Sequence, residues 1–177
     1  MKFKKNTLRI FAAVLFVMCL ATLLCACSEK KEIKDDVKVK DDVKATDLSK
    51  TAKEAIPIKD GYASITDADY LEFNFEGLPT AKEYDIFITT NPTANINEVG
   101  IFHFANADEA AKAESIVAQY IKTKSDAWKS AANYTPEENP KMESATCKVI
   151  GNYVVYTILT EKDSATVMSA VENALTK

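Results

Sequence analysis

Residues 84–104 read YDIFITTNPTANINEVGIFHF, and this stretch decides the fold. Its two ends, residues 84–89 and 99–104, are rich in β-branched and aromatic side chains, which favour strands. Between them, Asn91-Pro92 opens a polar segment that is typical of a turn. The sequence therefore predicts two neighbouring strands that pair in the antiparallel sense.

A long helix is predicted directly after this pair, over residues 107–131. Asn106 followed by Glu109 has the spacing of a capping box, which marks a helix start. Apolar side chains then recur at steps of three and four residues, at Ala113, Ile116, Val117, Tyr120, Ile121 and Trp128. The polar, proline-containing residues 133–140 end the pattern.

The C-terminal part predicts a hairpin and a last helix. Gly151-Asn152 stands between two apolar runs, residues 147–150 and 153–160, as in a two-residue turn of the primed type. Asp163 is the expected cap of the helix that follows. That helix carries Val167, Met168, Val171 and Leu175 on one face.

Two shorter segments come before the central pair. Asp47 is the expected cap of a helix that runs to about Ile56 and stops at Pro57. Residues 66–76 show two patterns: a helix start with Thr66 as the capping hydroxyl, and strand-like alternation at Leu71, Phe73 and Phe75. We predict a short helix here, and the strand remains the alternative.

These elements predict one α+β domain over residues 47–177. The order ββαββα, with helices before it, implies a four-stranded, mainly antiparallel sheet covered by helices in a two-layer sandwich.

The N-terminal region has the features of a bacterial lipoprotein signal peptide. Three lysines and Arg9 precede an uncharged apolar run over residues 10–24. As a helix this run is roughly 22 Å long, shorter than the hydrocarbon core of about 30 Å. The sequence Leu24-Cys25-Ala26-Cys27 that follows resembles a lipobox. We expect residues 1–26 to be removed by cleavage between Ala26 and Cys27, and Cys27 to carry lipid such as palmitate; an uncleaved anchor is the alternative.

Residues 27–46 are predicted to form a flexible tether between the lipid and the domain. The segment KDDVK occurs twice, at 34–38 and 40–44, and charged residues dominate this stretch. Such a composition buries too little apolar surface to offset the entropy of ordering. A short charged helix that docks to a partner is the alternative.

Charge excludes one class of partner. The chain has 26 acidic and 22 basic residues, and its only arginine, Arg9, lies in the expected signal peptide. Nucleic-acid binding needs a basic surface, so we expect no nucleic-acid partner. The expected partners are the membrane, through Cys27, and an envelope protein or small ligand.

No pattern of residues predicts catalysis, a metal site or a cofactor. His103 is the only histidine, lies mid-strand and is read as an ordinary strand residue. Cys147, the one thiol left after processing and lipidation, is read as a small buried residue rather than a reactive one. The acidic residues Asp67, Asp69, Glu72 and Glu76, and the pair Glu137-Glu138, are read as solvated charges; weak Ca²⁺ binding by the first group is the alternative.

Aromatic residues are the remaining candidates for a binding surface. Tyr120, Trp128, Tyr134, Tyr153 and Tyr156 suit a ligand groove, but helix and strand periodicity already places most of them in a core.

Several stretches together are similar to the domain-of-unknown-function 4358 family of bacterial lipoproteins. They are Glu98-Val99-Gly100-Ile101-Phe102, the long helix after it, Tyr134-Thr135-Pro136 and Gly151-Asn152-Tyr153-Val154-Val155-Tyr156. The resemblance covers roughly residues 47–176 and implies a surface lipoprotein without assigning a catalytic residue.

The sequence thus leaves three hypotheses for function. The first is a membrane-anchored, extracytoplasmic module that binds a ligand or protein without catalysis. The second is an extracytoplasmic hydrolase that acts on glycan or peptide through carboxylates such as Asp67 or Glu72. The third is a structural role, in which the domain spaces or masks other envelope components.

Overall fold

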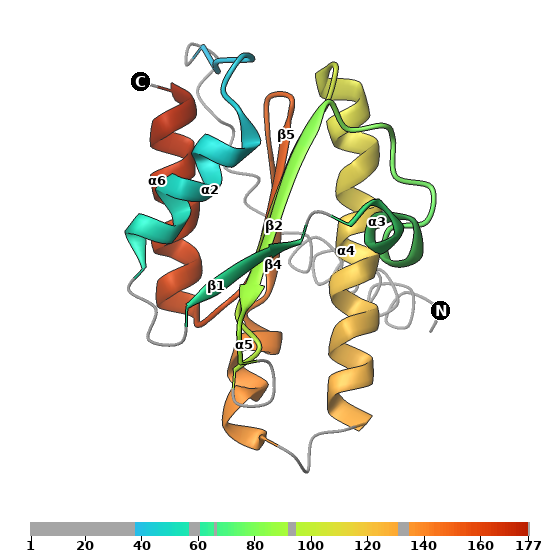
Figure 1. Cartoon of the computed structure of the whole chain (residues 1–177), viewed down its shortest axis with the longest axis vertical. Helices are drawn as coiled ribbons and strands as arrows, with labels where there is room; N and C mark the ends of the chain where they lie inside the picture. The colour runs from blue at the N-terminus through green and yellow to red at the C-terminus, as the bar shows by residue number, and fades with distance from the viewer. Residues whose placement is uncertain (1–37, 57–60, 66, 92–94, 131–134, 177) are drawn as a thin grey trace, which may run out of the picture. The chain divides into compact units, whose positions relative to one another are not determined.

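The computed structural model describes residues 38–56, 61–65, 67–91, 95–130 and 135–176. The described residues do not include the expected signal peptide or residues 27–37 of the expected tether, of which Cys27 is the first. They also do not include Pro57, Thr66 and Tyr134. In chain order the elements are α2 (Ala45–Ala55), β1 (Tyr62–Ile65), α3 (Ala68–Asn74), β2 (Glu83–Thr89), β3 (Glu98–His103), α4 (Ala107–Ser130), the 3-10 helix η1 (Pro136–Glu138), α5 (Asn139–Glu143), β4 (Thr146–Ile150), β5 (Tyr153–Ile158) and α6 (Glu161–Thr176) (Figure 1).

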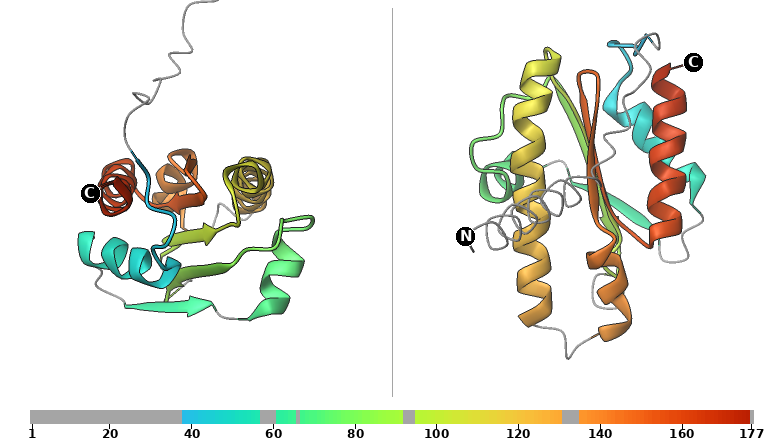
Figure 2. Two further views of the ribbon diagram at one scale, coloured as in Figure 1. Left: turned by 90° about the horizontal axis from the view of Figure 1, so that it is seen from above. Right: turned by 180° about the vertical axis from the view of Figure 1, so that it is seen from behind.

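A five-stranded sheet in the order β1-β2-β3-β5-β4 forms the centre of the domain, and every neighbouring pair is antiparallel. Helices α2 and α6 cover one face, and α3 and α4 cover the other (Figures 1 and 2). The predicted α+β class and the antiparallel sheet under helices are confirmed. The structure adds a fifth strand, β1, and places helices on both faces, so that the sheet is the middle of three layers.

Alternation along β3 explains why both faces are covered. Val99 and Ile101 pack with Leu48 of α2 and Val171 of α6, whereas Phe102 packs with Val117 of α4. Successive side chains of a strand point to opposite faces, and β3 is apolar on both. Such a strand is stable only when each of its faces has a layer of helices.

The predicted short helix is confirmed, because α3 occupies Ala68–Asn74. Its cap is the carboxylate of Asp67, which accepts a hydrogen bond from the Asp69 amide at 3.0 Å. Phe73, one of the residues in the strand-like alternation, is 91% exposed. The helix turns Phe75 into the core and leaves Phe73 on the surface.

The predicted cap of the long helix is confirmed. Asn106 accepts a hydrogen bond from the Glu109 amide at 2.9 Å, and the Glu109 carboxylate accepts one from the Ala105 amide at 3.2 Å. The first bond satisfies a backbone donor that the first turn of α4 leaves unpaired, and the second ties the residue before the cap to that turn.

The predicted caps at Asp47 and Asp163 are wrong. Helix α2 begins at Ala45, so Asp47 lies in its first turn. Helix α6 begins at Glu161, and the Thr160 hydroxyl accepts the hydrogen bond of the Asp163 amide at 3.2 Å. In both cases the carboxylate still lies near the positive end of the helix dipole, which explains the misleading signal.

Residues before the predicted domain start at residue 47 also pack on the domain. Residues 38–44, here called the strap, belong to the same compact unit as the rest of the domain. Val39 and Val43 pack against the core beside α6, and the Lys40 amide donates to the Leu175 carbonyl at 2.9 Å. The Tyr153 hydroxyl donates to the Val43 carbonyl at 2.8 Å. The last part of the expected tether is therefore part of the fold, because its two valines find apolar partners that composition alone does not reveal.

The β4–β5 hairpin has the predicted two-residue turn. Ile150 pairs with Tyr153 across it, and Gly151 has a φ of +58° while no described non-glycine residue has a positive φ. This pattern is typical of a type II′ hairpin turn, which takes glycine at its first position. Val39 of the strap packs against the same glycine.

Candidate functional site

The most unusual feature of the core is a charged residue in the central strand. Glu98 of β3 is only 1% exposed, and its Oε1 accepts hydrogen bonds from the hydroxyls of Tyr120 and Tyr156, each at 2.6 Å. Its Oε2 forms an ion pair with Nζ of Lys124, which also donates to the Tyr120 hydroxyl at 3.1 Å. We call Glu98, Tyr120, Lys124 and Tyr156 the Glu98 cluster.

Three elements hold this cluster together. Glu98 comes from β3 and Tyr156 from β5, which pairs with it, while Tyr120 and Lys124 lie one turn apart on α4. Tyr70 of α3 extends the cluster toward the surface through a 3.0 Å hydrogen bond between its hydroxyl and that of Tyr120.

The cluster keeps its tyrosines protonated. Burial, and secondarily the Glu98 charge, raises the pKa of Tyr70 to about 12. The same two causes raise the pKa values of Tyr120 and Tyr156 well above the usual value for tyrosine. The phenols are therefore hydrogen-bond donors at neutral pH, and they satisfy a carboxylate that would otherwise be buried without partners.

Gly100 makes room for the cluster. It lies opposite Tyr156 in the sheet, and a Cβ added to it would lie 2.0 Å from the Cε1 atom of the Tyr156 ring. Any larger residue at position 100 would push this ring away from Glu98.

A groove of about 650 Å³ between α3 and α4 adjoins the exposed side of the cluster. Tyr70, Tyr120 and Lys124 form part of its lining, and Phe73 stands on its rim. Glu98 does not line this groove. Glu98 and Lys124 instead line a smaller pocket of about 180 Å³, together with Ile96 and Trp128. The two tyrosine hydroxyls and the Lys124 ammonium neutralise the buried carboxylate.

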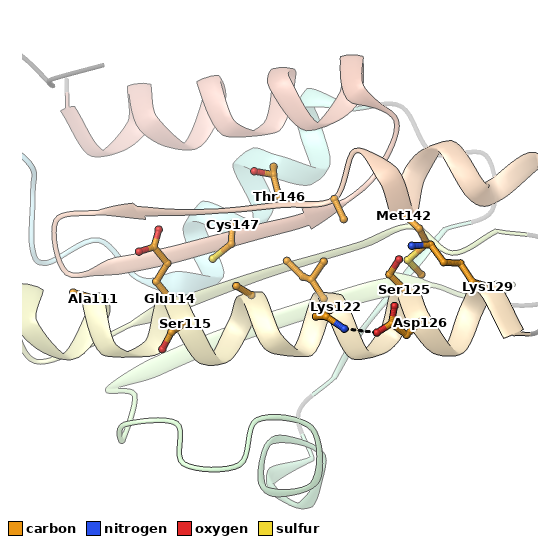
Figure 3. Close-up of a pocket in the computed structure, with 13 residues that line it drawn as sticks. Ala111, Glu114, Ser115, Lys122, Ser125, Asp126, Lys129, Met142, Thr146 and Cys147 are labelled. Atoms are coloured by element: carbon orange, nitrogen blue, oxygen red, sulfur yellow. Dashed lines mark hydrogen bonds and ion pairs between the residues drawn. The ribbon is translucent and has the colours of Figure 1, made fainter. Parts of the chain in front are cut away.

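A second groove, of about 700 Å³, lies between α4 and β4, and we call it the α4–β4 groove (Figure 3). Ala118, Ile121, Met142 and Cys147 provide apolar lining, and charged side chains of α4 such as Glu114 stand at its rim. Figure 3 shows the Cys147 side chain pointing from β4 toward α4, with Thr146 pointing to the other side of the strand. The groove is thus bordered by a helix on one side and by an edge strand of the sheet on the other.

Cys147 in this groove is a protonated thiol, because burial, together with the nearby Glu114 charge, raises its pKa to about 12. Only the thiolate reacts with alkylating reagents. We expect iodoacetamide at pH 8 to modify Cys147 about a thousandfold more slowly in the folded protein than in the urea-unfolded chain. Mass spectrometry of the tryptic peptide that ends at Lys148 measures both rates, and equal rates would show that the thiol is not held in this environment.

His103 lies apart from both sites. His103 lies five residues after Glu98 on β3, and successive side chains of a strand alternate between faces, so the two side chains lie on opposite faces of the sheet. On its own face the His103 ring stacks on Tyr153 at a centroid distance of 4.4 Å. Burial, and then the charge of Lys82, lowers the pKa of His103. The stacked, buried ring agrees with the interpretation of His103 as an ordinary strand residue.

The acidic candidates do not form a common site in the described residues. Asp67, Asp69, Glu72 and Glu76 are all exposed, and the Asp67 carboxylate is engaged as the cap of α3. No group of three or more His, Cys, Asp or Glu residues in the described part of the chain is arranged to hold a metal ion.

Glu138 differs from the expected solvated charge because it is buried. It accepts a hydrogen bond from the Ile96 amide at 2.9 Å and pairs with Lys141 at 2.7 Å. These contacts join the segment before β3 to the α5 region. The prediction for Glu138 was wrong because its partner in the segment before β3 is distant in sequence.

The aromatic candidates are mainly core residues. Tyr120, Tyr153 and Tyr156 are buried, and the Trp128 indole N–H donates to Asn139 Oδ1 at 3.0 Å. The four that the structure describes form no shared exposed surface. The groove between α3 and α4 instead presents Phe73, which the sequence pattern alone did not mark as exposed.

A family model described as a domain of unknown function, DUF4358, matches residues 79–159. Residues 79–159 are therefore similar to the DUF4358 domain. The family resemblance expected from the sequence is thereby confirmed, over a shorter stretch that runs from before β2 to the end of β5. No curated protein and no solved structure matches the chain.

The DUF4358 match contains the whole Glu98 cluster and Gly100, together with every lining residue of the α4–β4 groove. Two of the stretches that carried the resemblance meet in the cluster, because β3 supplies Glu98 and Gly100 and β5 supplies Tyr156. No helix in the described part of the chain is long and apolar enough to cross a membrane.

Proposed function

We propose that this protein is a lipid-anchored, extracytoplasmic module that binds another molecule of the cell envelope without catalysing a reaction. The anchoring rests on Leu24-Cys25-Ala26-Cys27, which follows a basic start and an uncharged apolar run. On this proposal Cys27 becomes the lipid-bearing first residue after cleavage behind Ala26.

The observation that carries the binding role is the α4–β4 groove. It is a large open groove with an apolar floor and a charged rim. Binding sites commonly combine an apolar lining, which buries the ligand, with a few polar groups that orient it. Its only strong nucleophile, Cys147, is held protonated. The carboxylates that the hydrolase hypothesis would use, Asp67 and Glu72, are exposed on α3 and lie outside its lining.

Lipid attachment is tested by growing cells with an alkyne-bearing fatty acid and detecting the label on the full chain. We expect Cys27→Ser to lose essentially all label and to retain residues 1–26, because the acylated thiol is absent. The matched variant Cys25→Ser keeps the label, since Cys25 lies two residues before the proposed cleavage bond. An unlabelled wild-type protein that still begins at Met1 would overturn the proposed anchor.

The binding role is tested separately by cross-linking intact cells that carry the lipidated protein. A specific cross-linked partner, absent from cells without the protein, supports the proposal. If cross-linking returns no specific partner and no envelope component raises the melting temperature, the binding role fails while the anchor stands.

A further inference from the structure

Strand β4 lies at the edge of the described sheet, in which it pairs with β5 alone. Among the described residues, no hydrogen bond joins the main chain of β4 to any other segment. A free edge of this kind presents backbone donors and acceptors in the pattern that another strand requires.

The hairpin turn determines which of these groups point outward. Ile150 and Tyr153 flank the two-residue turn, so they form a hydrogen-bonded pair across the ladder. Hydrogen-bonded and non-hydrogen-bonded positions alternate in an antiparallel pair, so Lys148 and Thr146 also bond to β5. Cys147 and Val149 therefore direct their N–H and C=O groups toward the free edge.

The α4–β4 groove provides space for the side chains of an added strand. A new strand would lie about 4.8 Å beyond β4, and alternate side chains would point toward α4. There they meet Ala118, Ile121 and Met142 on the apolar floor. Two of the charged side chains at this rim, Lys122 and Asp126, neutralise each other in an ion pair at 2.5 Å. The groove thus favours apolar side chains at every second position of the bound segment.

A second copy of this chain is a poor occupant of the same edge. Antiparallel pairing of two β4 strands about their centre places Lys148 opposite Lys148, and like charges directly opposite one another destabilise a sheet. Each Lys148 is already paired with Glu172 of its own chain at 2.7 Å. Lysine on an edge strand is a common protection against self-association.

We propose that the α4–β4 groove binds an extended peptide segment of another protein, which adds to β4 as an antiparallel strand. The inference rests on the proposed binding function and names its site and the chemistry of its partner. The main chain of Cys147 and Val149 supplies the hydrogen bonds, and α4 supplies the apolar contacts. Recognition of this type takes its affinity from the backbone and its specificity from alternate side chains.

The probe is a phage-displayed library of random eight-residue peptides, selected against the full chain in detergent. Enriched peptides are synthesised and their dissociation constants are measured by calorimetry. We expect them to share apolar residues at alternate positions. Amide exchange followed by NMR locates them: in the free protein the Cys147 and Val149 amides exchange rapidly and the Lys148 amide slowly, and peptide binding protects the first two.

Two substitutions on α4 provide a matched comparison. Ala118 is exposed and lines the α4–β4 groove, whereas Ala127 is exposed and lines the groove between α3 and α4. We expect Ala118→Trp to fill the first groove and weaken peptide binding at least tenfold. Ala127→Trp makes the same change on the same helix and leaves the affinity within twofold of wild type.

Three results would overturn the inference. If the selected peptides protect amides outside β4, or lose affinity in Ala127→Trp rather than in Ala118→Trp, the groove is wrong and the binding role survives. If the Cys147 and Val149 amides become protected in the protein alone as its concentration rises, the occupant is a second copy. If no peptide is enriched over beads without protein, the edge does not bind peptides, and the cross-linking experiment decides independently whether the protein binds anything else.

Discussion

Replacing Gly100 with alanine is expected to lower the free energy of unfolding by about 3 kcal/mol. The added Cβ would lie 2.0 Å from the Tyr156 ring, which is fully buried between the sheet and α4. Neither the backbone of a central strand nor a packed ring can move aside cheaply. The displaced ring would also take its hydroxyl away from the Glu98 carboxylate. Urea unfolding, followed by the fluorescence of the single tryptophan, Trp128, and by circular dichroism, measures the loss.

Gly77→Ala is the control, because this glycine is required for its backbone conformation rather than for lack of space. Gly77 has a φ of +79°, and nothing lies within 4 Å of a Cβ added there, so the change tests backbone strain without a clash. Its expected cost is about 1 kcal/mol. Combining Gly100→Ala with Tyr156→Val removes the ring that causes the clash, so the double variant should be more stable than the sum of the single effects predicts. A Gly100→Ala protein as stable as Gly77→Ala would contradict this packing.

Replacing Lys124 with methionine is expected to cost about 3 kcal/mol of stability. Glu98 would keep its charge in a site where it is 1% exposed, while losing its ion-pair partner. The Lys124 side chain is 33% exposed, so water moderates the loss and places it at the low end for a broken buried pair. The change in the midpoint of urea unfolding measures it.

Lys122→Met is the matched control, because it is the same change on the same helix. The Lys122–Asp126 pair has side chains that are 67% and 55% exposed, so its loss should change stability by less than about 0.5 kcal/mol. The double variant Glu98→Gln with Lys124→Met removes both charges and should regain much of the loss, since an amide can still accept the tyrosine hydrogen bonds. Equal effects of Lys122→Met and Lys124→Met would mean that Glu98 is not stabilised by this ion pair.

Local patterns predicted most of the elements correctly. Strands β2 and β3, helix α4, the β4–β5 hairpin and helix α6 each carry a strong period in their own residues. Strand β1 was missed because Tyr62–Ile65 is only four residues long and lies at the edge of the sheet, with its two middle residues exposed. The strap was predicted to be a flexible tether because most of its residues are charged. The prediction did not foresee that its two valines, Val39 and Val43, pack on the core.

The candidate site was predicted much less well than the fold. The sequence pattern marked Tyr120 and Tyr156 as aromatic candidates, and it placed Gly100 in a stretch that resembles the DUF4358 family. It offered no signal that Glu98 is buried with them. Glu98 lies 22 residues from Tyr120 and 58 from Tyr156. Only strand pairing and the packing of α4 on the sheet bring such positions together.

The amino-acid sequence by itself determined the class of fold, the net charge of −4 and the resemblance to the DUF4358 family, because each depends on composition or on patterns between near neighbours. The tertiary structure alone decided that both faces of the sheet are covered, that a carboxylate is neutralised inside the core, and that a free strand edge borders an apolar groove. These properties depend on which distant segments pair and in which register. A shift of one residue in that register would turn every side chain of β3 to the opposite face.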